Sequence, residues 1–162
     1  MNARDIEALR AFYVGNRQPL YTYAVSITKS REAAEDAIQV VFEKLLRGAT
    51  LPADLRPYVF RSVRNAALDA WRRTKVRLDS LFETAAVLDA AKPEAPPASR
   101  PDDLELLLQQ LSADERETIV LKTYSGLTFQ QIADMRDVPL PTVASWYRRG
   151  LEQLRILLTE ES

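Results

Sequence analysis

The sequence predicts an all-α protein of two small helical domains, joined by a linker rich in proline and alanine, with a helix-turn-helix at the end of the second domain. Helical periodicity runs through most of the chain, and no segment shows the alternation typical of a half-buried strand. Four prolines fall within residues 90–101, where they disfavour a helix or a strand. We therefore expect a first domain at residues 1–77, a linker at 78–102 and a second domain at 103–162.

Each helix is located by its apolar spacing and by the signals at its ends. The predicted helices cover residues 3–15, 18–28, 31–47, 55–75, 103–110, 113–124, 129–135 and 141–158. Ser112 and Thr128 each stand three residues before an acid or amide, as capping residues do. Gly126 suits the C-terminal end of helix 113–124. Residues 77–89 are mildly amphipathic, so they either extend the first domain or form a loose segment.

The composition excludes several classes of chemistry. The 162 residues include no cysteine and no histidine, which rules out thiol catalysis, disulfides, imidazole catalysis and zinc sites built from those residues. Only four glycines are present, and no glycine-rich phosphate loop, so we expect neither an enzyme nor a cofactor or metal site. No apolar run approaches the length of a membrane span, and the N-terminus lacks the apolar core of a signal peptide. These features predict a cytoplasmic protein that does not insert into membranes.

The net charge of −1 hides a strong asymmetry along the chain. Residues 1–75 carry 13 Lys and Arg against 8 Asp and Glu, a net charge of +5. Residues 76–103 and 104–162 each have a net charge of −3. Residues 56–77 include seven basic side chains and a single acidic one, Asp69. A basic stripe on an otherwise neutral protein indicates contact with a polyanion on one face.

Helix 31–47 carries a polar stripe opposite its core face. On a helical wheel three side chains lie within about 60° of Asp36: Glu32, Gln39 and Glu43. Val40 lies about 40° from Asp36, so an apolar side chain stands among hydrogen-bond acceptors. A solvated acidic face is ordinary for a surface helix, whereas an apolar residue ringed by polar groups is typical of a protein interface. These residues alone leave both interpretations open.

Helix 55–75 has a core stripe on one side and a basic face on the other. The core stripe consists of Val59, Val63, Ala66 and Ala70. The basic face consists of Arg61, Arg64, Asn65, Leu68, Arg72 and Lys75, with Phe60 and Trp71 at its flanks. Guanidinium groups neutralise phosphates, and aromatic rings stack on unpaired bases. The two aromatic residues could instead cover the margin of the core, and for Phe60 this is the favoured interpretation.

Residues 126–150 predict a short helix, a tight turn and a longer second helix. Three residues share the face of the second helix that we expect to be buried against Ile132 and Leu121: Val143, Tyr147 and Leu151. The side that we expect to face duplex DNA presents two hydroxyls and two guanidiniums: Thr142, Ser145, Arg148 and Arg149. Such a helix suits the major groove of DNA. An ordinary helical hairpin with a solvated outer face fits the same segment.

Four segments in this order resemble bacterial sigma factors of the extracytoplasmic-function group, the smallest members of the sigma-70 family. They are LYTYAVSIT (20–28), AEDAIQVVF (34–42), RPYVFRSVRNAALDAWRR (56–73), and LSADER (111–116) with the helix-turn-helix that ends in RRGLEQLR (148–155). Each segment is weak by itself, but the four together, in the right order and spacing, are specific.

The resemblance implies a non-catalytic factor that directs core RNA polymerase to specific promoters and initiates transcription. Helix 31–47 would bind core polymerase through Glu32, Glu35, Asp36, Gln39, Val40 and Glu43. Helix 55–75 would open the minus-ten element of promoter DNA through Arg61, Arg64, Asn65, Leu68, Trp71, Arg72, Arg73 and Lys75, with the loop 47–55 around a flipped base. The second domain would contact the minus-thirty-five element through Thr142, Ser145, Arg148 and Arg149. An anti-sigma factor is a further expected partner.

The chain departs from the usual pattern of this family at five positions. The family usually has an acid at Val40, Glu at Gln131 and Gly at Asp137, and often has Lys and Arg at Ala144 and Trp146. The loss of two cations from the reading helix should weaken phosphate contact, and Trp146 lies at the border of the core face. The departures keep two alternatives open: a sigma-like protein that sequesters an anti-sigma factor or polymerase, and a stand-alone helix-turn-helix regulator.

Overall fold

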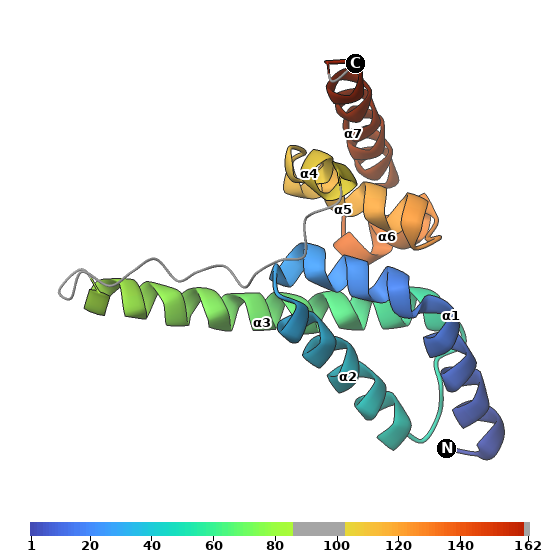
Figure 1. The fold of residues 1–162 in the computed structure, drawn as a ribbon. Coiled ribbons are helices and arrows are strands. Elements are labelled where there is room, and N and C mark those ends of the chain that lie inside the picture. Colours follow the sequence, from blue (N-terminus) through green and yellow to red (C-terminus); the bar gives the residue numbers. More distant parts are fainter. Residues whose placement is uncertain (86–102, 161–162) are drawn as a thin grey trace.

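The computed structural model describes residues 1–85 and 103–160 (Figure 1). Its helices are α1 (Ala3–Thr28), α2 (Arg31–Arg47), α3 (Leu55–Ala85), α4 (Asp103–Gln109), α5 (Ala113–Ile119), α6 (Phe129–Arg136) and α7 (Leu140–Glu160). A π-helical turn, η1 (Val120–Tyr124), follows α5 directly. No strand occurs in the described ranges, and the all-α prediction is confirmed there. Residues 86–102, which hold most of the predicted linker, lie outside the described residues.

The first helix corrects the prediction of two helices at 3–15 and 18–28. α1 is a single helix that contains Pro19, and Figure 1 shows that it bends along its length. A proline inside a helix removes one backbone hydrogen bond and crowds the carbonyl four residues earlier, here that of Gly15, which bends the helix without ending it. Next to this position the Asn16 side chain donates to the Phe12 carbonyl oxygen at 2.9 Å. α1 ends where Lys29 adopts a left-handed conformation at φ 57°.

The first three helices pack around an apolar core that continues into the second group of helices, where it includes Leu121 and Ile132. Its largest fully buried side chains include Tyr23 of α1 and Phe60 of α3, which confirms the favoured interpretation of Phe60 as a core residue. α3 continues to Ala85, ten residues past the predicted end at 75, so residues 77–85 extend the helix of the first domain. Figure 1 shows the C-terminal part of α3 projecting away from the other helices. The basic face of α3 therefore lies on a long helix whose C-terminal part projects from the helices packed against its first half.

The second group of helices begins and ends at the predicted signals. The Ser112 side chain caps α5, and Thr128 and Gln131 form a complete capping box at α6. Gly126 has φ 74°, as expected for the residue that ends the helical segment before it. Asp137 closes α6 at φ 56° and ψ 47°, a left-handed conformation that Asp tolerates less readily than Gly. The chain thus forms the predicted helix-turn-helix.

The buried face of α7 differs from the prediction at Leu151, which is 41% exposed. Val143 is fully buried, and Tyr147 is half-buried. Gly150 is buried against Ile119, because a Cβ at position 150 would lie 2.6 Å from Ile119 Cδ1. Val143 and Gly150 lie about 20° apart on a helical wheel, whereas Leu151 lies about 80° from Val143. The buried face of α7 is therefore centred on Val143 and Gly150, and Leu151 lies at its edge.

Candidate functional site

The predicted polymerase-binding residues form one exposed face of α2. All six are exposed to solvent: Glu32, Glu35, Asp36, Gln39, Val40 and Glu43. Gln39 Nε2 donates to Glu43 Oε1 at 3.1 Å, and Val40, one turn after Asp36, is 42% exposed. The face is acidic and accessible, and none of the other described helices covers it.

Next to this face, a groove runs between α2, the loop 48–52 and α3. Its wall combines apolar side chains with polar groups of α3, among them Val40, Leu51, Pro52, Tyr58, Asn65 and Arg73. Tyr58 is 48% exposed. The groove places the loop, which the resemblance assigned to a flipped base, beside an amide and a guanidinium that could contact such a base.

The basic face of α3 is exposed over most of its length. Six of the eight predicted residues are exposed, and Leu68 and Arg64 are half-buried; the exposed ones are Arg61, Asn65, Trp71, Arg72, Arg73 and Lys75. Trp71 is 37% exposed, and Lys75 Nζ lies 5.0 Å from the centre of its indole. The face therefore presents cations together with an accessible aromatic ring, the combination that single-stranded nucleic acid binds.

The predicted reading residues of α7 lie in its first three turns. Arg148 and Arg149 are exposed, and Thr142 and Ser145 are half-buried. Trp146 is also half-buried and stacks on Arg136 of α6, whose guanidinium carbon lies 4.9 Å from the indole centre. Position 146 therefore holds a packing side chain that contacts the preceding helix of the motif.

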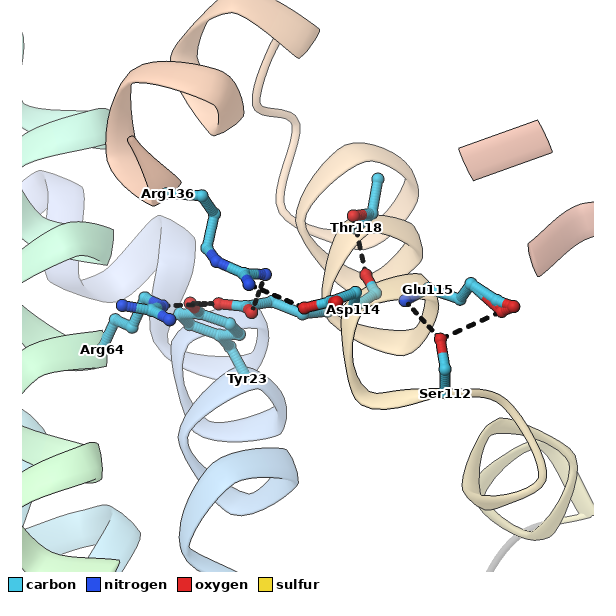
Figure 2. Close-up of polar contacts among 8 residues, drawn as sticks. Tyr23, Arg64, Ser112, Asp114, Glu115, Thr118 and Arg136 are labelled. Carbon is cyan, nitrogen blue, oxygen red and sulfur yellow. Dashed lines mark hydrogen bonds and ion pairs between the residues drawn. The ribbon is translucent and has the colours of Figure 1, made fainter. Parts of the chain in front are cut away.

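Sequence reasoning missed a polar cluster where the two domains meet. Glu117 of α5 accepts from Tyr23 Oη at 2.6 Å, from Arg64 Nε at 2.7 Å and from Arg136 Nη1 at 2.5 Å. Figure 2 shows the side chains of Tyr23, Arg64 and Arg136 converging there. Arg136 also donates to Asp114 Oδ1 at 2.7 Å. Helical wheels could not reveal the cluster, because its members belong to four different helices.

The same cluster shifts the ionisation of two of its members. Burial, and then the charge of Glu117, raise the pKa of Tyr23 well above its ordinary value, so its hydroxyl stays protonated and donates. Burial lowers the pKa of Arg136, but Glu117 and Asp114 outweigh it and raise that pKa overall. Arg136 thus remains a cation within the packed interior.

Two classes of site are absent from the described residues. No group of three or more acidic side chains within residues 1–85 and 103–160 is placed to hold a metal ion. None of the described helices combines the length and the apolarity that a membrane crossing requires.

Comparison with known proteins places both domains in one family. Residues 12–77 match the profile of sigma-70 region 2, and residues 102–154 match that of sigma-70 region 4. The RNA polymerase sigma factor CarQ of Myxococcus xanthus is 31% identical over 144 residues, which cover 85% of this chain and 82% of CarQ. The chain belongs to the extracytoplasmic-function sigma factors of the sigma-70 family.

Other relatives of this sigma factor agree in sequence and in fold. The extracytoplasmic-function sigma factor SigK of Mycolicibacterium vanbaalenii is 30% identical over 164 residues, covering 94% of this chain and 82% of SigK. The sigma factor RpoE of Bartonella quintana, solved in complex with the anti-sigma factor NepR, has the same fold, with a TM-score of 0.68. It is 22% identical, and the match covers 94% of this chain and 98% of RpoE. Members of this family are non-catalytic transcription initiation factors.

Proposed function

We propose that this sigma factor binds core RNA polymerase and promoter DNA in the cytoplasm through three separate surfaces. The division into region two, whose last helix runs to Ala85 and so past the predicted boundary at 77, a linker that ends at 102, and region four at 103–162 is part of the proposal. The observation that carries it is the face of α3, where arginines and an accessible Trp71 stand together with Asp69 as the only acid within residues 56–77. Such a face suits a melted DNA strand.

The first surface, on α2, binds core polymerase. The double variant Asp36→Arg and Gln39→Arg should abolish co-purification with core polymerase and leave helicity unchanged, because it reverses the charge of an exposed face. A matched control changes Gln130 and Asp134 of α6, an exposed amide and acid on neighbouring turns joined by a hydrogen bond of 2.9 Å, to Arg. Retention of core polymerase by the α2 variant would reduce that face to solvated surface.

The second surface, on α3, binds the minus-ten element. Arg61→Ala and Arg72→Ala should each lower the salt slope of promoter binding by about one unit, since each removes one phosphate contact. Trp71→Ala should slow promoter opening, measured by permanganate reactivity of unpaired thymines, more than it weakens duplex binding. Wild-type opening by that variant would assign the indole to packing.

The third surface, at the start of α7, binds the minus-thirty-five element. Arg148 should read a base edge, because a bidentate contact between Arg and guanine gives about 1–3 kcal/mol of discrimination. Arg148→Ala should therefore flatten preference at one position in a promoter selection experiment. Arg149 lies nearer the edge of the helix, so Arg149→Ala should weaken all sequences alike.

Run-off transcription with core polymerase separates this function from its alternatives. A stand-alone regulator would bind DNA but not core polymerase, and a protein that sequesters an anti-sigma factor or polymerase would produce no transcript. We also propose an anti-sigma factor as partner, by analogy with the complex solved for RpoE. Co-expression with the product of a neighbouring regulatory gene should abolish run-off transcription if that product is the anti-sigma factor.

A further inference from the structure

One carboxylate, that of Glu117, joins region four to region two. Tyr23 and Arg64 of region two both donate to its Oε1, at 2.6 Å and 2.7 Å, while Arg136 of region four donates to Oε2. Figure 2 shows Tyr23, Arg64 and Arg136 around this point. Only 14% of the Glu117 side chain is exposed, so solvent screens these charges less than those of a surface pair.

Arg64 differs from the other arginines of its face in what it contacts. Arg61 and Arg73 are exposed, and Arg72 pairs with Asp69 of its own helix at 3.6 Å, with both side chains about two-thirds exposed. The Arg64 side chain is only 22% exposed, and its partner belongs to the other domain. A guanidinium that holds a carboxylate beneath a packed domain cannot reach a phosphate or a base at the same time.

Two further contacts attach region four to the start of α3 and the loop before it. Arg56 Nη1 donates to Asn16 Oδ1 at 2.7 Å and to the Ser125 carbonyl oxygen at 2.8 Å. Gln131 Nε2 donates to Asp54 Oδ2 at 3.3 Å. An acid at position 131 would set two carboxylates against each other, so the amide found there permits this contact. Region four thus contacts region two at Asp54 and Arg56, directly after the loop beside the groove.

We propose that region four folds back onto region two and covers Arg64 at one edge of its promoter face, with Glu117 occupying this guanidinium as an internal substitute for a DNA phosphate. This inference rests on the proposed role of the α3 face in promoter binding. In the closed form Arg64 contacts Glu117, and in the open form it contacts DNA, so the two contacts exclude each other. The free chain is mostly closed, and its apparent affinity for DNA is reduced by the fraction that is open.

The first measurement is the distance between the two domains in the full chain. The sequence contains no cysteine, so Arg31→Cys on α2 and Gln153→Cys on α7 can carry a donor and an acceptor dye for energy transfer. Glu117→Gln keeps the shape of the side chain but removes its charge, and it should lower the transfer efficiency. Glu115→Gln on the same helix, where the carboxylate accepts from the Ser112 hydroxyl of its own N-cap, should leave the efficiency unchanged.

The second measurement is the affinity of the same proteins for a mixed-sequence single-stranded DNA oligonucleotide, followed by fluorescence anisotropy. If the closed form holds nine-tenths of the molecules, opening should tighten binding about tenfold. The gain should disappear when Glu117→Gln is combined with Arg64→Ala. Glu117 also binds Arg136 within region four, so Glu117→Gln could destabilise that domain. A second variant therefore opens the chain without changing Glu117. Gln131→Glu keeps the capping box and adds repulsion from Asp54, so it should also open the chain, and Asp54→Lys should restore closure.

The outcomes separate the inference from the function on which it rests. Unchanged energy transfer in both Glu117→Gln and Gln131→Glu would overturn the closed form, and if Arg61→Ala still weakened DNA binding, the promoter role of α3 would stand. Lower energy transfer with no gain in DNA affinity would overturn the competition for Arg64. If Arg61→Ala also had no effect, the promoter role of α3 would fall with it.

Discussion

Replacing Arg136 with Ala tests whether buried ion pairs stabilise region four. Its guanidinium donates to Glu117 Oε2 at 2.5 Å and to Asp114 Oδ1 at 2.7 Å, and 14% of the side chain is exposed. Removing one partner of a buried ion pair costs about 3–5 kcal/mol, because the other charge stays buried without compensation. Asp114 is 46% exposed and therefore screened, and Glu117 keeps two other donors. We expect the free energy of unfolding to fall by about 3 kcal/mol, the lower end of that range.

The measurement is urea unfolding of the full chain, followed by circular dichroism at neutral pH. Arg155→Ala is the matched control, since Arg155 pairs with Glu152 at 2.6 Å but both side chains are more than half exposed. That variant should change the free energy of unfolding by less than about 0.5 kcal/mol. Arg136→Met keeps an apolar stem against Trp146 and should recover part of the loss, because packing and charge both contribute. A loss for Arg136→Ala no larger than that for Arg155→Ala would refute the reasoning.

Three further predictions concern single positions. The raised pKa of Tyr23 means that the native state holds the phenol proton more tightly than the unfolded chain does. The contribution of the protonated phenol to the free energy of unfolding is therefore complete below pH about 10 and declines above it. The difference in unfolding free energy between the wild type and Tyr23→Phe should shrink from pH 9 to pH 11. Gly150→Ala should destabilise by about 1 kcal/mol, because a Cβ would lie 2.6 Å from Ile119 Cδ1, and should become stabilising in an Ile119→Val background that lacks this atom; thermal unfolding of the single and double variants measures both. Asp137→Gly should raise the free energy of unfolding by about 0.5 kcal/mol and Asp137→Val should lower it, since φ is 56° there; equal stability of the two variants would contradict this.

Local signals in the sequence were sufficient for most elements of the fold. The cap of α5 at Ser112, the capping box of α6 and the positive φ of Gly126 all follow from residues within four positions of one another. Exposure of the acidic face of α2 follows equally from helical spacing. The bend in α1 does not, because whether Pro19 ends or only bends a helix depends on the helices packed against both halves.

Contacts between the two domains could not be predicted from the sequence either, because they join residues far apart along the chain. Arg64 was assigned to DNA with the rest of the basic face, where Asp69 is the one acid among seven cations within residues 56–77, yet its partner is Glu117, 53 positions later. A helical wheel places a side chain on a face but does not say what covers that face. Leu151 shows the same limit on a smaller scale, since a shift of the packed centre toward Gly150 was enough to expose it.

The two tryptophans of the chain provide an optical consequence of the fold. Trp71 stands 37% exposed on α3, whereas Trp146 is half-buried in region four with the Arg136 guanidinium against its indole. An indole in water emits at longer wavelength than one shielded from it, so the native emission spectrum is the sum of a red-shifted and a blue-shifted component, one from each domain. Trp71→Phe leaves region four as the only tryptophan emitter, and Trp146→Phe leaves region two. The two variants thus report the unfolding of one domain each, without any attached dye.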